Sequence, residues 1–305
     1  MLKKLIEPFR PNPFDKLLKK MEKEEKSRFL VVWNRGLGDI PLGLYALVCR
    51  IRSYIPRASV TFVTRKDLAD LFAMIDDVKV IVGESVVRGK AVDVNAVLKE
   101  HQLSPNMFDV VLEKPNPTRW LKWQLGTLIP KLNWNPEWDA LIDKYELDPN
   151  ETYIGCHVQA ETGVYYEYEK NWDLPSWRNL FKKIHEKKKG KVLLFGMESE
   201  PAFLMEDLID LRGKTNVFEM LSLIKNRCRY LVAPDSGVLS VTYYVDASYP
   251  IRVVSLWADP QQGVLRQKVD SPNPLFEHLP LHGKNDTVAN ISVDTVYDAL
   301  LKNPI

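Results

Sequence analysis

The sequence predicts an α/β protein with two domains, each built on a parallel sheet with crossover helices. Short β-branched runs alternate with longer stretches of helical period along the chain, which is typical of strand, helix, strand units. A chain of 305 residues is long for a single core and suits two domains of about 150 residues each. Hydrophobic residues make up 45% of the chain and charged residues 27%, a composition that excludes wholesale disorder.

The first domain is expected over residues 29–150, after a basic segment of residues 1–28. Its elements are predicted in this order: strand 29–33, helix 42–54, strand 59–63, helix 66–75, strand 78–82 and strand 108–112. Residues 113–152 interrupt the alternation with prolines and tryptophans, so a helix and an interdomain linker are expected there. The interrupting residues include Pro115, Pro117, Trp120, Trp123, Pro130, Trp134, Pro136 and Trp138.

The second domain, residues 151–305, continues the alternation. Its elements are predicted near residues 153–157, 174–188, 191–195, 201–211, 217–226, 230–233, 237–245 and 251–256, with a closing helix near 293–301. The closing helix has two expected positions, on its own domain or packed back on the first domain. Because two such domains place the carboxyl ends of two sheets across a cleft, we expect ligands to bind there.

Charge, cysteine content and hydropathy narrow the class of protein. The formal net charge is +2, so the chain lacks the strong positive charge of a nucleic-acid-binding protein, and no nucleic-acid partner is expected. Cys49, Cys156 and Cys228 have no CxxC spacing, and their odd number argues against a disulfide framework. No apolar run reaches about 18 residues. These features together favour a reducing cytoplasm.

The first 28 residues differ from the rest of the chain. They carry nine Lys or Arg against five acidic residues, a net charge of +4. Apolar residues are interspersed among these charges: Leu2, Leu5, Ile6, Phe9, Phe14, Leu17 and Leu18. Two interpretations stay open. The segment lies on an anionic membrane surface, or it forms a leader helix that packs on its own protein with its charges in solvent.

The first candidate site is the turn Gly36-Leu37-Gly38-Asp39, directly after the first predicted strand. The next glycine is Gly43, so the spacing is not G-x-G-x-x-G, and no G-K-[ST] follows. This spacing argues against a dinucleotide site or a P-loop. Asp39 precedes a predicted helix with Pro41 in its first turn. It is either the N-cap of that helix or a catalytic base to which the glycines give a substrate hydroxyl access.

The second candidate site combines the polar stretches 157–163 and 169–177. Lys170 stands just before a predicted helix and is either a cation that holds a diphosphate or a solvated surface lysine. His157 ends a predicted strand, and a structural role is expected for it because no second histidine lies at metal-ligand spacing.

Two further turns follow predicted strands. Asp235-Ser236-Gly237 lies between a strand and a helix, where backbone N–H groups and small side chains favour a phosphate. Asp235 itself is either an acceptor for sugar hydroxyls or an ordinary cap. Gly196 gives a flat base access to the backbone, and Glu198 beyond it is either a ribose ligand or part of a plain loop.

Taken in order, these stretches resemble glycosyltransferase family 9, the heptosyltransferases of lipopolysaccharide core assembly. The resemblance covers roughly residues 29–265, and its specificity lies in the ordered set rather than in any one motif. The matching stretches are Gly36-Leu37-Gly38-Asp39, the strand Tyr153–His157, Lys170 with Trp172 and Trp177, Leu194–Gly196, Asp210-Leu211-Arg212-Gly213-Lys214-Thr215, and Asp235-Ser236-Gly237.

The resemblance implies a GT-B fold, with two Rossmann-like α/β domains whose parallel sheets face each other across a cleft. It implies an inverting transfer that uses neither a cofactor nor a metal. The first domain would bind the acceptor beside Arg35, Gly36 and Gly38, Asp39 would take the proton of the attacking hydroxyl, and Lys170 would stabilise the leaving nucleotide diphosphate. The donor-binding residues would be Thr162, Gly163, Gly196, Glu198, Asp235, Ser236 and Gly237.

The resemblance also implies partners and a location. The donor would be a nucleotide sugar, on family grounds ADP-heptose, and the acceptor would be a lipid-linked saccharide of the lipopolysaccharide core or a related saccharide. The protein would work in the cytoplasm at the inner face of the cytoplasmic membrane, where its basic first residues would contact anionic lipid.

Two other functions stay open. The family's phosphate loop is rich in Gly, Ser and Thr, whereas this chain has Gln159 and Ala160, with Thr162-Gly163 further on. A degenerate nucleotide-sugar-binding protein without turnover would fit that loop. A dehydrogenase would keep the fold but needs G-x-G-x-x-G and an acid about 20 residues later, and the sequence fits neither requirement. The tyrosines within 165–168 are expected either as a lip over the acceptor or packed at the interdomain hinge.

Overall fold

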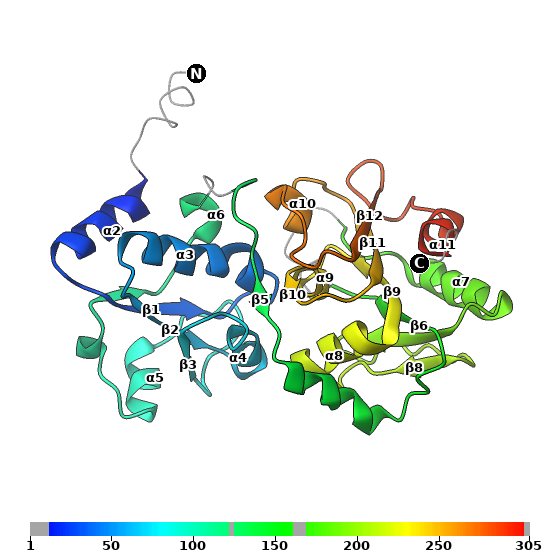
Figure 1. Ribbon diagram of the computed structural model, residues 1–305, viewed down its shortest axis with the longest axis horizontal. Helices are drawn as coiled ribbons and strands as arrows, with labels where there is room; N and C mark the ends of the chain where they lie inside the picture. The colour runs from blue at the N-terminus through cyan, green and yellow to red at the C-terminus, as the bar shows by residue number, and fades with distance from the viewer. Residues whose placement is uncertain (1–11, 122–124, 161–168, 302–305) are drawn as a thin grey trace, which may run out of the picture. The chain divides into compact units, whose positions relative to one another are not determined.

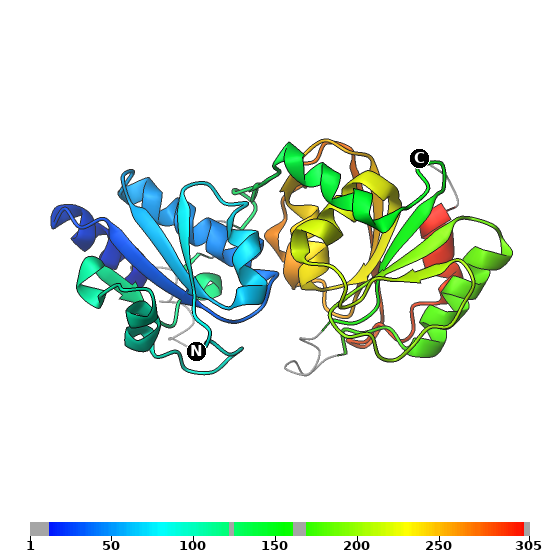
Figure 2. The same cartoon turned by 90° about the horizontal axis from the view of Figure 1, so that it is seen from below.

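The computed structural model describes residues 12–121, 125–160 and 169–301. Contacts divide the chain into two units (Figures 1 and 2). One unit comprises Met1–Arg35 and Gly43–Leu125, and the other comprises Gly36–Leu42 and Gly126–Ile305. Every strand pair in the described residues is parallel, so the predicted α/β class with parallel sheets is confirmed.

The first unit contains a four-stranded sheet in the order β3-β2-β1-β4. Its strands are β1 (Arg28–Trp33), β2 (Ser59–Thr64), β3 (Val78–Val82) and β4 (Val110–Leu112). Its helices are α2 (Pro13–Lys23), α3 (Tyr45–Tyr54), α4 (Lys66–Phe72), α5 (Val94–Glu100) and α6 (Pro117–Trp120), with a short 3₁₀ turn, η3 (Pro105–Met107). Leu30 and Val32 of β1 form one core with Val97 and Leu98 of α5. Because the strands are parallel, their carboxyl ends share one edge of the sheet.

The second unit contains a six-stranded sheet in the order β12-β11-β9-β6-β7-β8. Its strands are β6 (Tyr153–His157), β7 (Lys191–Phe195), β8 (Leu208–Asp210), β9 (Cys228–Pro234), β11 (Ile251–Trp257) and β12 (Phe276–His282). Its helices are α7 (Leu174–Glu186), α8 (Val217–Arg227), α9 (Gly237–Tyr243), α10 (Gly263–Gln267) and α11 (Val293–Leu301), and β5 (Leu132–Asn133) pairs with β10 (Val245–Asp246). The core under α7 joins Trp177 and Phe181 with Val254 of β11 and Val296 of α11.

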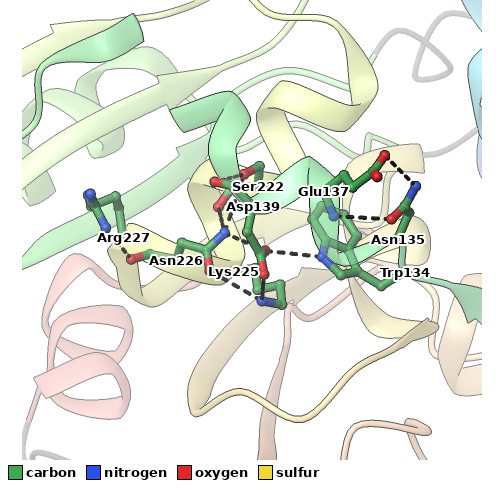
Figure 3. A network of polar contacts seen from close by, with 8 residues as sticks. All are labelled: Trp134, Asn135, Glu137, Asp139, Ser222, Lys225, Asn226 and Arg227. Atoms are coloured by element: carbon green, nitrogen blue, oxygen red, sulfur yellow. Dashed lines mark hydrogen bonds and ion pairs between the residues drawn. The ribbon is translucent and has the colours of Figure 1, made fainter. Parts of the chain in front are cut away.

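The segment before β6 belongs to the second unit. Its 3₁₀ helix η5 (Pro136–Tyr145) packs on α8, and Figure 3 shows Asp139 at the centre of the contact. Asp139 accepts hydrogen bonds from Trp134 Nε1 at 3.1 Å, Lys225 Nζ at 2.8 Å and Asn226 Nδ2 at 2.9 Å. The boundary between the units therefore lies at residues 125 and 126, whereas the sequence placed it at residues 150 and 151.

The two ends of the chain each pack on their own unit. Helix α11 contacts α7, where Lys183 forms an ion pair with Asp294, so the closing helix takes the first of its two expected positions. Helix α2 buries Phe14, Leu18 and Met21 in the first unit. Residues 13–23 therefore pack on their own protein through the apolar side of α2, and the membrane interpretation stays open for its charged side. Residues 1–11 lie outside the described residues.

Some elements differ from the prediction. The helix expected from residue 42 begins as a π-helical turn, η2 (Ile40–Leu44), and continues as α3. The segment predicted at 201–211 ends in strand β8. Helix α5 and strand β12 were not predicted. Pro280 obscures β12 in the sequence, and it is tolerated there because β12 is an edge strand.

Two global expectations can be compared with the structure. Cys49, Cys156 and Cys228 are all free thiols. Within residues 12–121, 125–160 and 169–301, every helix is too short or too polar to cross a bilayer.

Candidate functional site

The opening glycine turn lies in the second unit, against the turn that precedes α9. A methyl group on Gly38 would lie 3.1 Å from Ser240 Oγ and 3.3 Å from Gly237 Cα. A methyl group on Gly237 would lie 3.0 Å from Leu37 Cβ and 3.2 Å from Gly38 N. The two glycines therefore allow two backbones to approach closely. Turns that are about 200 residues apart in the sequence form one structure.

Asp39 lies at the end of this turn and is half-buried. A methyl group on Gly36 would lie 3.0 Å from Asp39 Oδ2, so the carboxylate turns back over Gly36. Asp39 itself is helical, and the helix runs from it through η2 into α3 without a break. Both interpretations of Asp39, as a cap at the start of this helix and as a catalytic base, therefore stay open.

Lys170 is not a solvated surface lysine. Its Nζ lies 2.6 Å from Asp235 Oδ2, and the two side chains are 8% and 9% exposed. Burial raises the pKa of the Asp235 carboxyl above its usual value, the Lys170 ammonium opposes that rise, and the charge of Asp259 adds to it. The lysine expected to hold a diphosphate is thus joined to one of the residues expected to bind the donor.

The loop that carries Lys170 is held at several points. Trp172 Nε1 donates to the Ile291 carbonyl at 3.0 Å, and its ring meets Trp177 edge-on with centroids 5.2 Å apart. Asn171 Oδ1 accepts the Ala160 N–H at 2.7 Å. Both tryptophans of the Lys-x-Trp pattern are therefore buried anchors that position Lys170. The expected donor residues Thr162 and Gly163, and the tyrosines of 165–168, lie outside the described residues.

The carboxylate of Asp235 is fixed from a second side by α10. A methyl group on Gly263 would lie 2.4 Å from Asp235 Oδ1 and 2.8 Å from the Trp257 ring. Gly263 has φ +49°, a left-handed conformation that favours glycine. The Asp235 N–H donates to the Leu256 carbonyl at 3.1 Å, so it is not available for a phosphate as the sequence suggested.

Ser236 serves the helix that follows. It is the N-cap of α9, and its Oγ accepts the Leu239 N–H at 3.2 Å. Its carbonyl accepts both the N–H and the Oγ–H of Ser240. In this turn the cap is therefore Ser236, and Asp235 is the partner of Lys170.

Gly196 follows β7 beside two buried polar side chains. A methyl group on Gly196 would lie 3.5 Å from Arg212 Cγ and 3.9 Å from His157 Cδ2. Within the described residues His157 Nδ1 and Arg212 Nη1 are buried without hydrogen-bond partners. Burial lowers the pKa of His157 to about 4, so its imidazole is neutral at pH 7.

Arg212 organises the loop that contains Glu198. Its guanidinium binds both oxygens of Asp210, at 2.9 Å and 2.6 Å. It also donates to the carbonyls of Ser199 and Pro201, at 2.7 Å and 3.1 Å. Glu198 is exposed on the loop that these bonds hold. The Asp-Leu-x-Gly-Lys-Thr stretch thus contributes Arg212, which sequence reasoning did not single out.

The carboxyl edge of the first unit's sheet gathers arginines. Arg35 follows β1 and is exposed, with its guanidinium 5.7 Å from the Trp33 ring centroid. Arg65 follows β2, and its Nη2 lies 2.8 Å from Asp67 Oδ2 and 3.5 Å from the Arg35 carbonyl. Burial lowers the pKa of Arg65, Asp67 opposes this, and the charge of Arg88 adds to it.

Asn34 places the loop of Arg88 beside this edge. Its Nδ2 donates to the carbonyls of Val87 and Lys90, at 2.7 Å and 2.8 Å. The sequence analysis named only Arg35 here and missed Arg65 and Arg88. The available signal was an arginine after each of three successive predicted strands.

The arrangement resembles no metal centre. Within the described ranges, no group of three or more His, Cys, Asp or Glu is placed to hold a metal ion. The polar groups present suit anions and hydroxyls instead.

Comparison with known proteins yields structures but no sequence relatives. No family model matches the chain, and no curated protein matches it. A family 9 glycosyl transferase from Veillonella parvula DSM 2008 superposes with a TM-score of 0.60 and 14% identity, over 90% of this chain and 96% of that chain. The E. coli ADP-heptose lps heptosyltransferase II gives a TM-score of 0.58 and 16% identity, over 89% and 97%.

A third structure is the E. coli heptosyltransferase WaaC with ADP-2-deoxy-2-fluoro heptose, with a TM-score of 0.50 and 13% identity, over 88% of this chain and 97% of that chain. At these identities the likeness establishes a shared fold. The chain has the GT-B fold of these glycosyltransferases, and the resemblance to family 9 is confirmed at that level.

Proposed function

We propose that the chain is an inverting, metal-independent glycosyltransferase. It transfers a sugar, heptose from ADP-heptose, onto a lipopolysaccharide-core or related saccharide acceptor. The fold supports this function, because the superposed structures named above are a family 9 transferase and heptosyltransferases. A fold alone does not determine activity, so the proposal depends on the site.

One observation carries the proposal: the opening turn and the turn before α9 form a single structure in the second unit. The contact between Gly38 and Gly237 brings the loop of Asp39 to the loop of Asp235. Asp235 in turn binds Lys170. A base and a cation for the leaving group must serve the same sugar, and this contact links their two loops.

The proposed reaction has one displacement step. The Asp39 carboxylate removes the proton of an acceptor hydroxyl, whose oxygen attacks the anomeric carbon of the donor sugar. The bond from that carbon to the diphosphate oxygen breaks, and the nucleoside diphosphate leaves with the electron pair. Lys170, beside Ser236 and Gly237, stabilises the negative charge that develops on it.

The first unit supplies features that suit an anionic acceptor. Arg35, Arg65 and Arg88 collect positive charge at one sheet edge, with Asp67 as the acid that pairs with Arg65. Guanidinium groups bind carboxylates and phosphates with paired hydrogen bonds. The acceptor is therefore proposed to carry such a group. A lipid-linked acceptor would place the protein at the inner face of the cytoplasmic membrane.

The direct test is transfer by the purified chain. It is incubated with ADP-heptose and a lipopolysaccharide core that lacks heptose, and the product is measured by mass spectrometry. Asp39→Asn should lower kcat by about 10² to 10⁴, the usual contribution of a general base. Asp143→Asn, an exposed acid in η5, is the matched control and should keep the wild-type rate. Full activity of Asp39→Asn would remove the assigned base.

A second candidate function is nucleotide-sugar binding without turnover. The observation that favours it is the buried pair of Lys170 and Asp235, which engages the cation that a leaving group would need. ADP should then raise the melting temperature, because it binds only the folded chain, while no acceptor receives sugar. Transfer to any core acceptor would exclude this candidate.

A further inference from the structure

Helix α2 carries one face made entirely of lysine side chains. Lys16, Lys19, Lys20 and Lys23 are spaced i, i+3, i+4 and i+7, which places them on one side of an α-helix. All four are exposed. These four residues are called the lysine face below.

The opposite side of α2 is fixed in the first unit. Phe14, Leu18 and Met21 are at most 4% exposed. The ring of Phe14 stacks on Trp120, with centroids 4.9 Å apart and planes inclined by 10°. Asn12 caps the helix by accepting the Phe14 N–H at 3.0 Å. The helix is thus held with its apolar side inward and its lysine face outward.

The acidic residues near α2 leave the lysine face positive. Arg50 Nε donates to Asp15 Oδ1 at 2.8 Å, so that carboxylate is directed at the protein. Glu22 is exposed and lies one helical turn beyond Lys19, so it borders the lysine face and offsets part of its charge. Glu24, beyond the helix, is 3.7 Å from Lys20 Nζ and 2.7 Å from Lys26 Nζ, so it is shared between two cations.

Two lysines of α7 are paired with acids. On α7, Lys182 Nζ lies 3.7 Å from Glu186, and Lys183 pairs with Asp294 of α11. A mixture of signs is usual for a solvated helix face. On α2 the ion pair of Lys20 with Glu24 still leaves more lysines than acids on one face, and that surplus suits an external anion.

We propose that the lysine face docks on the anionic headgroups of a phospholipid bilayer. Lys16 and Lys23 are about 10 Å apart along the helix axis, so the four ammonium groups can reach one flat surface together. Each basic residue near an anionic bilayer strengthens binding severalfold. The contact is electrostatic and does not insert the helix, because the apolar side of α2 is already covered by protein.

The sequence before α2 favours lipid over nucleic acid as the anion. It contains cationic residues with apolar residues between them, a combination that suits a bilayer interface. Apolar residues would gain nothing from contact with the hydrated phosphate backbone of a nucleic acid. These residues are Leu2, Lys3, Lys4, Leu5, Ile6, Phe9 and Arg10. This docking rests on the proposed function, because it would bring the enzyme to a lipid-linked acceptor. Binding of the lysine face to lipid does not itself require sugar transfer.

The test is vesicle cosedimentation with the full chain. Vesicles of phosphatidylcholine with about 30% phosphatidylglycerol should bind the protein, and pure phosphatidylcholine vesicles should not. Raising the salt from about 0.1 M to about 1 M shortens the Debye length from about 10 Å to about 3 Å and should release it. The variant K16Q/K19Q/K20Q/K23Q should lower the partition coefficient at least about tenfold.

The matched control removes the same charge from the other unit. K182Q/K187Q/K188Q/K189Q alters exposed lysines at the end of α7 and should keep partitioning within about twofold of wild type. Circular dichroism confirms that both variants are folded. Equal losses in the two variants, no loss in the α2 variant, or preferential binding to duplex DNA over the vesicles would each overturn the proposal.

A separate variant distinguishes this proposal from the proposed enzyme. Lys170→Met alters the second unit only, so it should bind vesicles as wild type does even if sugar transfer is lost. Vesicle binding in a chain that transfers no sugar would count against the transferase alone. Sugar transfer without any vesicle binding would count against the lysine face alone.

Discussion

The carboxyl edges of the two sheets differ in how their charged side chains are arranged. In the first unit, Arg35, Arg65 and Arg88 bring like charges to one exposed or half-buried edge. In the second unit, Lys170 and Asp235 form a buried pair whose charges compensate each other. Guanidinium groups at an accessible edge can bind an anion from outside, whereas a buried pair is costly to break from one side. The first edge leaves its charged groups accessible, and the second holds its charged groups in place.

The largest effect should come from breaking the buried pair. Lys170→Met leaves the Asp235 carboxylate buried without its cation, so the free energy of unfolding should fall by about 3 to 5 kcal/mol. Chemical denaturation measures this loss. Lys182→Met, which removes an exposed pair with Glu186, is the control and should cost under about 1 kcal/mol. An equal loss of unfolding free energy in the two variants would show that the buried pair contributes no more to stability than an exposed ion pair.

The second effect concerns pH and His157. Burial lowers the pKa of His157 to about 4 from 6.5, so the unfolded chain binds more protons between these values. The contribution of the neutral His157 imidazole to the free energy of unfolding is fully present above pH 6.5. It decreases as the pH falls, and about 3 kcal/mol is lost at pH 4. Denaturation at pH 6.5 and 5 measures the slope, which His157→Asn should reduce.

His278 provides the internal check for that slope. Burial, aided by the charge of His282, also lowers its pKa to about 4. The free energy of unfolding of the double variant of His157 and His278 should therefore change less between pH 6.5 and 5 than that of either single variant. A slope unchanged in all three variants would mean that these imidazoles are solvated.

The third effect tests how firmly Asp235 is held. Gly263→Ala should lower the free energy of unfolding by about 2 kcal/mol, from a left-handed φ and a clash with Asp235 Oδ1. Gly89→Ala is matched, because Gly89 has φ +69° and no atom within 4 Å of an added methyl group. It should cost about 1 kcal/mol. The difference between the variants measures the close packing of Gly263 against Asp235 and the Trp257 ring, and a difference of zero would contradict that packing.

The smallest effect belongs to the arginine edge. Arg65→Gln with Arg88→Gln should raise the KM for an anionic acceptor about tenfold while the donor KM stays constant. Arg57→Gln removes one exposed positive charge before β2, at the opposite edge of the sheet, and is the control. An equal change in acceptor KM in the test and control variants, or a change in donor KM, would contradict the assignment of the arginine edge to acceptor binding.

Much of the fold could be read from the sequence because buried parallel strands are continuous apolar runs. Strands β3, β6 and β7 have the bounds that were predicted. Strand β12 could not be read, since a half-buried edge strand with Pro280 has no apolar signature. The linker was assigned to the wrong unit, because its contacts with α8 through Asp139 depend on residues about 80 positions later.

The sequence singled out several residues of the candidate site but did not predict the contacts between them. Asp39, Lys170 and Asp235 were singled out from their local settings at strand and helix ends. The pairing of Lys170 with Asp235 and the role of Ser236 as cap were not foreseen. Arg65 and Arg88 were missed because each is an ordinary surface residue until Asn34 and the parallel sheet bring their loops together.

The sequence by itself determined the α/β class, most strands and the side chains at their ends, because apolar period and turn residues are local properties. Only the tertiary structure decided that Gly36–Leu42 belongs with the second unit, that Lys170 is buried against Asp235, and that α2 faces its lysines outward. Those outcomes depend on which distant backbones can approach and which charges lose their water. Both are properties of packing, and neither is encoded in a short stretch of sequence.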